Sequence, residues 1–240
     1  MISQPEPANG KSPYIDLAKE IGAEVEFQKF IQMEGLTAKE FREQRINILN
    51  YQAVVLTNRV SVDNYFRLAE ALRCEVPVDM RYFCSSEAIA NYLQKYIVYR
   101  KRKIFYSKNG QLDGLLSEMQ RYKEGNKFLV PMSEVHSPDL PNMLEKASYD
   151  FSVAIMYRTV SSDLSNINIA EKDLIAFFSP LGVESLFHNF PDYVQGDTAI
   201  AVFGKGTEAA AKKLGLRIDI MAPNPKAPSM KMAMEQFLGL

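Results

Sequence analysis

Residues 54–66, VVLTNRVSVDNYF, begin as an apolar run, pass through the polar pair Thr57-Asn58 and end with apolar residues spaced as on one face of a helix. Residues 175–187, IAFFSPLGVESLF, repeat this order without a gap, 121 positions further along the chain. Another apolar run and a turn of small residues follow each stretch. The repeat predicts two similar α/β domains, although any two strand–turn–helix units share part of the pattern.

The rest of the chain alternates in the same way. Short runs rich in Val, Ile and Phe are separated by amphipathic stretches of helical length, which is typical of a parallel sheet covered by helices. We therefore expect an α/β fold. The expected strands are residues 24–30, 53–57, 81–84, 103–106, 127–131, 151–159, 174–179, 199–203 and 217–221. The expected helices are residues 12–21, 37–49, 60–72, 87–97, 112–122, 140–147, 182–189, 207–214 and 229–238.

Composition excludes several classes of protein. The chain has 240 residues, of which 47% are apolar and 24% charged, and its formal net charge is −1. A nearly neutral chain has no overall positive field to hold nucleic acid or an anionic membrane, so we expect neither as a partner. The basic run 100–103 could bind an anion, but four cations in a neutral protein are more typical of an exposed turn before a strand.

The sequence also gives little support for a disulfide-bonded, membrane-spanning, secreted or metal-binding protein. Cys74 and Cys84 are the only cysteines, and no apolar run approaches the roughly 18 residues of a membrane span. The N-terminal residues lack the basic region and apolar core of a signal peptide, so we expect a cytoplasmic protein. His136 and His188 are the only histidines, and neither has metal-ligand spacing, so we expect no metal site.

Four turns could bind an anion. In parallel sheets the binding crevice lies beyond the carboxyl ends of the strands, where helix N-termini present free N–H groups. The turns of this kind are Thr57-Asn58, Ser85-Ser86, Ser179-Pro180 and Gly204-Lys205-Gly206-Thr207. Each has a structural explanation as well, since Ser, Thr and Asn are preferred N-cap residues. Four such turns in two domains would suit a ligand with several carboxylates.

Familiar catalytic signatures are missing. The Gly-x-Gly at 204–206 lacks the third glycine of a dinucleotide fingerprint and the ending of a P-loop, so nucleotide binding is weakly supported. The sequence contains no nucleophile elbow, and its carboxylates are scattered. Tyr157 stands out because it closes the apolar run 151–159, although an aromatic strand residue packed against a linker would look the same.

A set of motifs in a fixed order adds to this interpretation. Ser3-Gln4-Pro5 opens the chain, Leu56-Thr57-Asn58 and 178–183 are the two strand–turn–helix units, and Met156-Tyr157-Arg158-Thr159 closes a long strand. The chain ends with residues 204–207, a helix to Gly215, a strand and Ala222-Pro223. In this order and spacing the sequence resembles the uroporphyrinogen-III synthase family over nearly its whole length.

The resemblance implies two flavodoxin-like α/β domains with parallel sheets, one inserted into the other, joined by a two-stranded connection with a cleft between them. On this chain, residues 1–32 and 163–240 would form the discontinuous domain, and residues 33–162 the inserted one. The repeat at 121 positions agrees with this arrangement.

The resemblance also implies an activity. The substrate would be hydroxymethylbilane, a linear tetrapyrrole with acetate and propionate groups, which is cyclised with inversion of its last ring and loss of water, without a cofactor. We expect the Tyr157 hydroxyl to hydrogen-bond the leaving hydroxyl. We expect the carboxylates to be held by seven residues and nearby amides: Thr57, Asn58, Ser85, Ser86, Ser179, Lys205 and Thr207.

Three positions depart from the family pattern. Gln4 stands where a basic residue is usual, Ile89 where a Thr is usual, and Phe178 where the first residue of a Thr-Ser pair is usual. Only Met1 and Ile2 precede Ser3, so the first strand is expected to be almost absent.

Two other functions stay open. One is a non-catalytic, two-domain binding protein for a polyanion, and the other is a flavodoxin-like enzyme that binds a nucleotide. We expect a monomer, because a hinged cleft must open and close.

Overall fold

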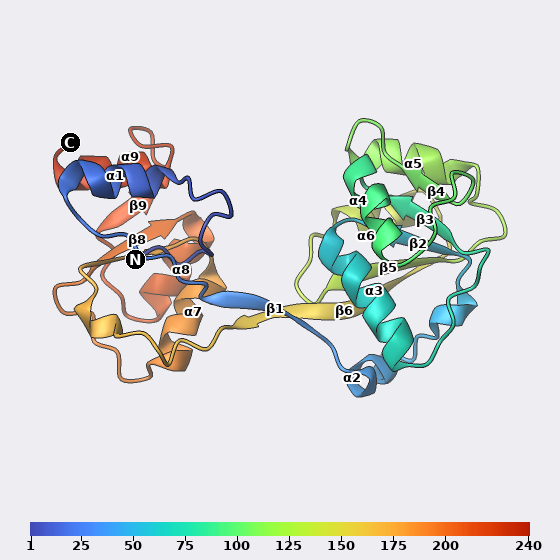
Figure 1. The fold of residues 1–240 in the computed structure, drawn as a ribbon, viewed down its shortest axis with the longest axis horizontal. Helices are drawn as coiled ribbons and strands as arrows, with labels where there is room; N and C mark the ends of the chain where they lie inside the picture. The colour runs from blue at the N-terminus through green and yellow to red at the C-terminus, as the bar shows by residue number, and fades with distance from the viewer. The chain divides into compact units, whose positions relative to one another are not determined.

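The computed structural model describes residues 1–240 and divides into two compact units (Figure 1). Unit 1 contains Met1–Gln32 and Val160–Leu240, and unit 2 contains Met33–Thr159. The family resemblance implied units of residues 1–32 with 163–240 and of residues 33–162. Because the chain leaves unit 1 once and returns to it once, unit 2 is an insertion.

Unit 2 is built on a parallel sheet. Its sheet has the order β1-β6-β5-β2-β3-β4, and the pairs formed by β6, β5, β2, β3 and β4 are all parallel. The chain crosses between the units in β1 and again in β6, and these two strands are neighbours in the sheet. The strands are β1 (Ile31–Gly35), β2 (Ala53–Leu56), β3 (Arg81–Cys84), β4 (Ile104–Tyr106), β5 (Phe128–Ser133) and β6 (Phe151–Ser161).

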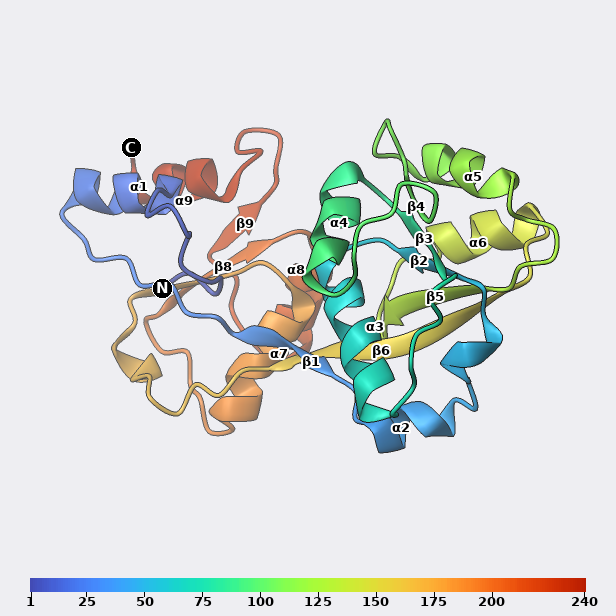
Figure 2. The ribbon, with the colours of Figure 1, turned by 45° about the vertical axis from the view of Figure 1, so that its right-hand side comes forward.

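Helices cover both faces of this sheet, because alternate strand residues are buried on opposite sides. Val54 and Leu56 pack with α2, α3 and α4, whereas Ala53 and Val55 pack with α5 and α6. Figure 2 shows α5 and α6 on the side of the sheet away from α3. The helices are α2 (Ala38–Glu43), α3 (Arg59–Ala71), α4 (Glu87–Tyr92), α5 (Leu112–Gln120) and α6 (Asp139–Lys146), with 3-10 turns η1 (Ile48–Asn50) and η2 (Leu93–Lys95).

Unit 1 has a second parallel sheet, in the order β7-β8-β9. Its strands are β7 (Leu174–Phe177), β8 (Ala199–Phe203) and β9 (Ile220–Ala222). Ile2 extends the sheet as a single residue, because it forms parallel bridges to Ala176 on one side and to Phe27 on the other. The resulting order, Phe27–Ile2–β7–β8–β9, is the flavodoxin order in which the second segment precedes the first.

Two layers of helices bury this sheet as well. Ile175 and Phe177 pack with α7 and α8, and Ala176 packs with α1 and α9. Figures 1 and 2 both show α1 and α9 side by side. The helices are α1 (Pro13–Ile21), α7 (Pro180–Asn189), α8 (Lys205–Lys213) and α9 (Met230–Leu238), with a 3-10 turn η3 (Ile169–Glu171).

The α/β prediction is confirmed, and the local differences have physical causes. The strand predicted at 24–30 is wrong, because its neighbour Ile2 offers one residue to pair with and the bridge forms only at Phe27. The helix predicted at 37–49 is interrupted, because Arg45 adopts a left-handed φ of 57° after α2. The basic run 100–103 leads through a turn into β4, with the Lys103 amide donating to the Arg100 carbonyl.

None of the helices is both long enough and apolar enough to span a membrane.

Candidate functional site

The order of the strands in unit 2 creates a crevice between β2 and β5. These strands are neighbours, but the helix after β2 covers one face of the sheet and the helix after β5 covers the other. At such a reversal the two loops separate, and ligands of doubly wound sheets bind there. A hollow of about 370 Å³ lies at this place. Its lining residues are Met33, Thr57, Asn58, Leu112, Met132, Ser133, Val135, His136, Ser137, Asp139, Leu140, Tyr157 and Thr159.

Tyr157 lines this hollow from β6, the strand next to β5. The register between β5 and β6 shifts after Met132, so that Ser133 pairs with Tyr157. The Tyr157 side chain is only 3% exposed. Burial raises the pKa of Tyr157, and the hydrogen bond from Asn58 lowers it in part. The phenol is therefore protonated near neutral pH and can donate a hydrogen bond.

Asn58 joins the β2 turn to Tyr157. Its Oδ1 accepts from the Ser61 backbone amide at 2.7 Å, which makes Asn58 the N-cap of α3. Its Nδ2 lies 3.1 Å from the Tyr157 hydroxyl. The amides of Arg59 and Val60 are the first two of the helix and have no acceptor within it, so they can bind an anion.

The loop after β5 adds a histidine to the hollow. His136 Nδ1 lies 2.7 Å from the Ser133 carbonyl oxygen. Because a carbonyl only accepts, Nδ1 carries a proton, and in the neutral form of the ring Nε2 is then an acceptor. Asp139 also lines the hollow and accepts from the Ser137 hydroxyl at 2.6 Å. The hollow thus contains a carboxylate and no lysine or arginine.

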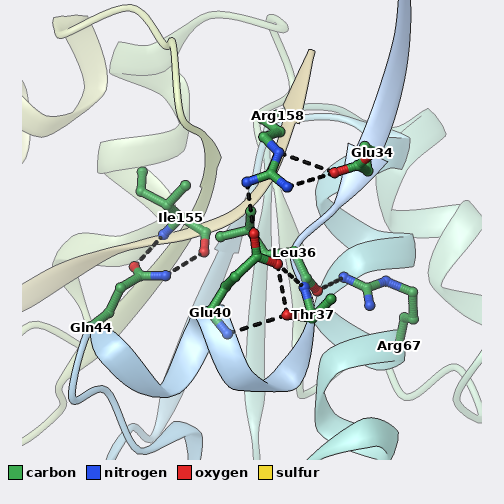
Figure 3. A network of polar contacts seen from close by, with 8 residues as sticks. All are labelled: Glu34, Leu36, Thr37, Glu40, Gln44, Arg67, Ile155 and Arg158. Atoms are coloured by element: carbon green, nitrogen blue, oxygen red, sulfur yellow. Dashed lines mark hydrogen bonds and ion pairs between the residues drawn. The ribbon is translucent and has the colours of Figure 1, made fainter. Parts of the chain in front are cut away.

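The strand that bears Tyr157 is braced by α2 (Figure 3). The Gln44 side chain forms two hydrogen bonds with the Ile155 backbone, accepting from its N–H at 2.9 Å and donating to its carbonyl at 2.7 Å. Arg158 lies between two carboxylates, 2.7 Å from Glu34 and 2.8 Å from Glu40. These contacts hold the β6 backbone on both sides of Tyr157.

The same network continues through the start of α2. Hydrogen bonds from the Thr37 side chain, the Thr37 backbone and Arg158 lower the pKa of Glu40 to about 2. Arg67 of α3 donates to the Leu36 carbonyl at 2.7 Å, and the Leu36 amide donates to Met156 of β6 at 2.9 Å (Figure 3 draws the Arg67 contact). Helices α2 and α3 are therefore tied to the strand that carries Tyr157.

The two serines of the β3 turn have different roles. The Ser85 hydroxyl donates to the Thr57 carbonyl at 2.8 Å, so it ties this turn to the β2 turn. Ser86 is the N-cap position of α4, but its side chain forms no cap hydrogen bond. Glu87 follows at once and carries a negative charge, which weakens the attraction of this helix end for a carboxylate.

Unit 1 has its own group of turn residues. Ser179 caps α7 by accepting from the Gly182 amide at 3.1 Å. Helix α8 begins after Gly204, which has a φ of 85° and no side chain to cap the helix. The first three amides of α8, those of Lys205, Gly206 and Thr207, therefore have no capping side chain, and Lys205 adds a positive charge there.

The structure thus places the predicted residues in three groups, of which Ser85 and Ser86 at the β3 turn do not line the hollow. Tyr157, Thr57 and Asn58 line one hollow in unit 2. Ser179 belongs to the β7 turn of unit 1, and Lys205 and Thr207 belong to the β8 turn next to it. The sequence did not point to His136 or to Asp139. Only the adjacency of β2 and β5 puts the loop that carries them beside Thr57, and strand order cannot be read from the apolar pattern.

A family model described as uroporphyrinogen-III synthase HemD matches residues 12–231. The uroporphyrinogen-III synthetase of Helicobacter pylori 26695 is 16% identical, with a TM-score of 0.53 over 90% of this chain and 93% of that chain. The wild-type uroporphyrinogen III synthase of the extremely thermophilic bacterium Thermus thermophilus is also 16% identical, with a TM-score of 0.45 over 99% of this chain and 97% of that chain. No curated protein sequence matches this chain.

Proposed function

Because the chain belongs to the uroporphyrinogen-III synthase family, a group of cyclising lyases of tetrapyrrole biosynthesis, we propose how its residues carry out that reaction. The enzyme converts hydroxymethylbilane to uroporphyrinogen III: the terminal hydroxyl leaves as water, the last ring is inverted and the macrocycle closes. The substrate can close unaided to the type I isomer. The protein must therefore hold the chain in the geometry that leads to inversion.

Tyr157 is the proposed catalytic residue. The observation that carries this assignment is the place of Tyr157, which lines the hollow at the reversal of the unit 2 sheet and whose hydroxyl accepts a hydrogen bond from Asn58. A phenol that stays protonated donates a hydrogen bond to the departing oxygen and stabilises the negative charge that develops on it. The braces at Ile155 and Arg158 fix the strand on both sides of Tyr157 and so limit the positions of its hydroxyl.

The carboxylates are proposed to bind at the turns of both units. In unit 2 the free amides at the start of α3 would bind one, beside Thr57, and Ser86 offers a hydroxyl near the next strand. Ser85 would act through the turn that it holds. In unit 1 the uncapped amides of α8, Lys205 and Thr207 would bind another, with Ser179 on the neighbouring turn. Local N–H groups suit a polyanion on a chain whose net charge is −1.

We propose further that the enzyme works as a cytoplasmic monomer, without a cofactor or a metal and without nucleic acid as a partner. Two free cysteines, one of them buried, are compatible with a reducing compartment. Size-exclusion chromatography with light scattering tests the oligomeric state, and a molar mass of two chains would overturn that part of the proposal.

The activity is tested on freshly generated hydroxymethylbilane. The products are oxidised, and the type I and type III isomers of uroporphyrin are separated by chromatography. The proposed enzyme gives type III faster than the substrate cyclises alone. Type I alone, formed at the spontaneous rate, would instead favour a non-catalytic protein that binds a polyanion.

A further inference from the structure

The orientation of the Asn58 amide follows from its neighbours. Its Oδ1 lies 2.7 Å from the Ser61 backbone nitrogen, which can only donate. If the amide were turned over, its NH₂ group would face that N–H, two donors at 2.7 Å. The oxygen must therefore face Ser61, and the NH₂ group must face Tyr157 at 3.1 Å and Thr57 Oγ1 at 3.4 Å.

This orientation determines what the Tyr157 hydroxyl can do. The hydroxyl oxygen accepts a hydrogen from Asn58 Nδ2, so its own proton is free to point elsewhere. The alternative is that Tyr157 donates to Asn58 Oδ1, but that distance is 3.5 Å, longer than the roughly 2.5–3.0 Å that is usual for a hydroxyl donor and an oxygen acceptor. The shorter contact is the one in which Tyr157 accepts.

We propose that Asn58 is a positioning residue: by donating to the Tyr157 hydroxyl it keeps the phenolic proton for the leaving hydroxyl of the substrate. This inference rests on the proposed function of Tyr157. It replaces the expectation that Asn58 binds a carboxylate directly, because both its amide hydrogens and its oxygen already have partners. The cap of α3 and the catalytic phenol are then linked through one side chain.

Two substitutions of Asn58 separate its role as the N-cap of α3 from its hydrogen bond to Tyr157. Asn58→Ser keeps an N-cap residue and adds no charge, but its side chain is too short to reach Tyr157. Asn58→Asp also keeps a cap, but a carboxylate accepts and cannot donate, so Tyr157 would turn its proton toward residue 58. Both variants should keep the melting temperature of the wild type within a few degrees. Asn47→Asp is a matched control, because Asn47 caps η1 in the same way, through the Leu49 amide, outside the hollow.

Steady-state kinetics on hydroxymethylbilane give the first test. We expect kcat to fall about tenfold or more in both Asn58 variants, with KM nearly unchanged in Asn58→Ser and no change in Asn47→Asp. In the background of Tyr157→Phe, substitution of Asn58 should lower kcat no further, because the hydroxyl it orients is gone. A raised KM with unchanged kcat in Asn58→Ser would mean that Asn58 binds substrate directly. Independent losses in the double variant would also overturn the proposal.

A second readout does not depend on activity. Tyrosine labelled with ¹³C at Cζ reports the titration of Tyr157, whose signal is assigned by its absence in Tyr157→Phe. A hydrogen bond donated to the phenol oxygen stabilises the phenolate, so its loss in Asn58→Ser should raise the titration midpoint of Tyr157. A lower or unchanged midpoint would mean that Tyr157 does not accept from Asn58. If the wild type forms no type III isomer, the proposed function fails while this measurement still tests the orientation.

Discussion

Replacement of Tyr157 by Phe removes a single oxygen from the hollow of unit 2. The ring stays within the buried cluster that it shares with α3, and only the hydroxyl is lost. Because the hydroxyl is the group proposed to stabilise the departing oxygen, the change should lower kcat. Binding of the carboxylates at the helix ends should persist, so KM should change little.

The size of the effect follows from the surroundings of the hydroxyl. Tyr157 is 3% exposed, so water competes poorly with its hydrogen bond to a developing charge. A hydrogen bond to a charged group contributes about 1.5–3 kcal/mol, which corresponds to about a 10- to 150-fold loss of kcat. The variant should also release more type I isomer, because bound substrate that is slow to react can dissociate and cyclise alone.

The assay follows both isomers from freshly generated hydroxymethylbilane at saturating concentration. Tyr149→Phe is a matched control, because Tyr149 is also buried in unit 2 and its hydroxyl contacts Leu116 and Gln120, which do not line the hollow. The control should keep the wild-type kcat. If Tyr157→Phe kept full turnover and the same isomer ratio, the proposed role of Tyr157 would be refuted.

Three further predictions concern the network, the core and the hollow. Since the pKa of Glu40 is lowered from 4.5 to about 2, its carboxylate stabilises the fold above pH 4.5, and this stabilisation disappears as the pH falls toward 2. Urea unfolding should therefore show Glu40→Gln less stable than the wild type at pH 7, and the difference in the free energy of unfolding should shrink below about pH 4.5. A difference that does not change with pH would show that the lowered pKa of Glu40 is not its cause. The buried Ser185 hydroxyl donates to the Phe30 carbonyl at 2.6 Å, so Ser185→Ala should lower the free energy of unfolding by about 1–3 kcal/mol in urea, and no loss would refute this contribution. His136→Gln should raise KM about three- to tenfold if Nε2 forms one hydrogen bond with substrate, whereas His188→Gln on α7 should not; equal effects would exclude the contact.

Much of the fold could be predicted because buried strands and helix faces require apolar residues at regular positions in the sequence. Strands covered on both faces read as continuous apolar runs, and those at 81–84 and 199–203 were predicted with their exact bounds. The failure at 24–30 arose because an apolar–polar alternation there has only one residue, Ile2, to pair with. The helix ends after Glu43 because Arg45 adopts a left-handed backbone conformation, which cannot be predicted from the residue type.

Part of the candidate site could also be predicted from the sequence. N-cap residues after apolar strands identified the turns at Thr57-Asn58 and Ser179, because cap chemistry is local. His136 could not be found in this way, since its loop comes beside Thr57 only through the pairing of β2 with β5. The contact between Asn58 and Tyr157 joins residues 99 positions apart and likewise depends on tertiary structure.

The central claim, that a tetrapyrrole polycarboxylate binds at the Tyr157 hollow and at the uncapped start of α8, can be tested by one NMR titration. Uroporphyrin III, the stable oxidised form of the product, is added to ¹⁵N-labelled protein, and the backbone amide shifts are followed. We predict that the largest changes occur at residues 57–61, at residues 133–139 and at residues 204–208. Changes confined to other surfaces, with these three segments unaffected, would contradict the account.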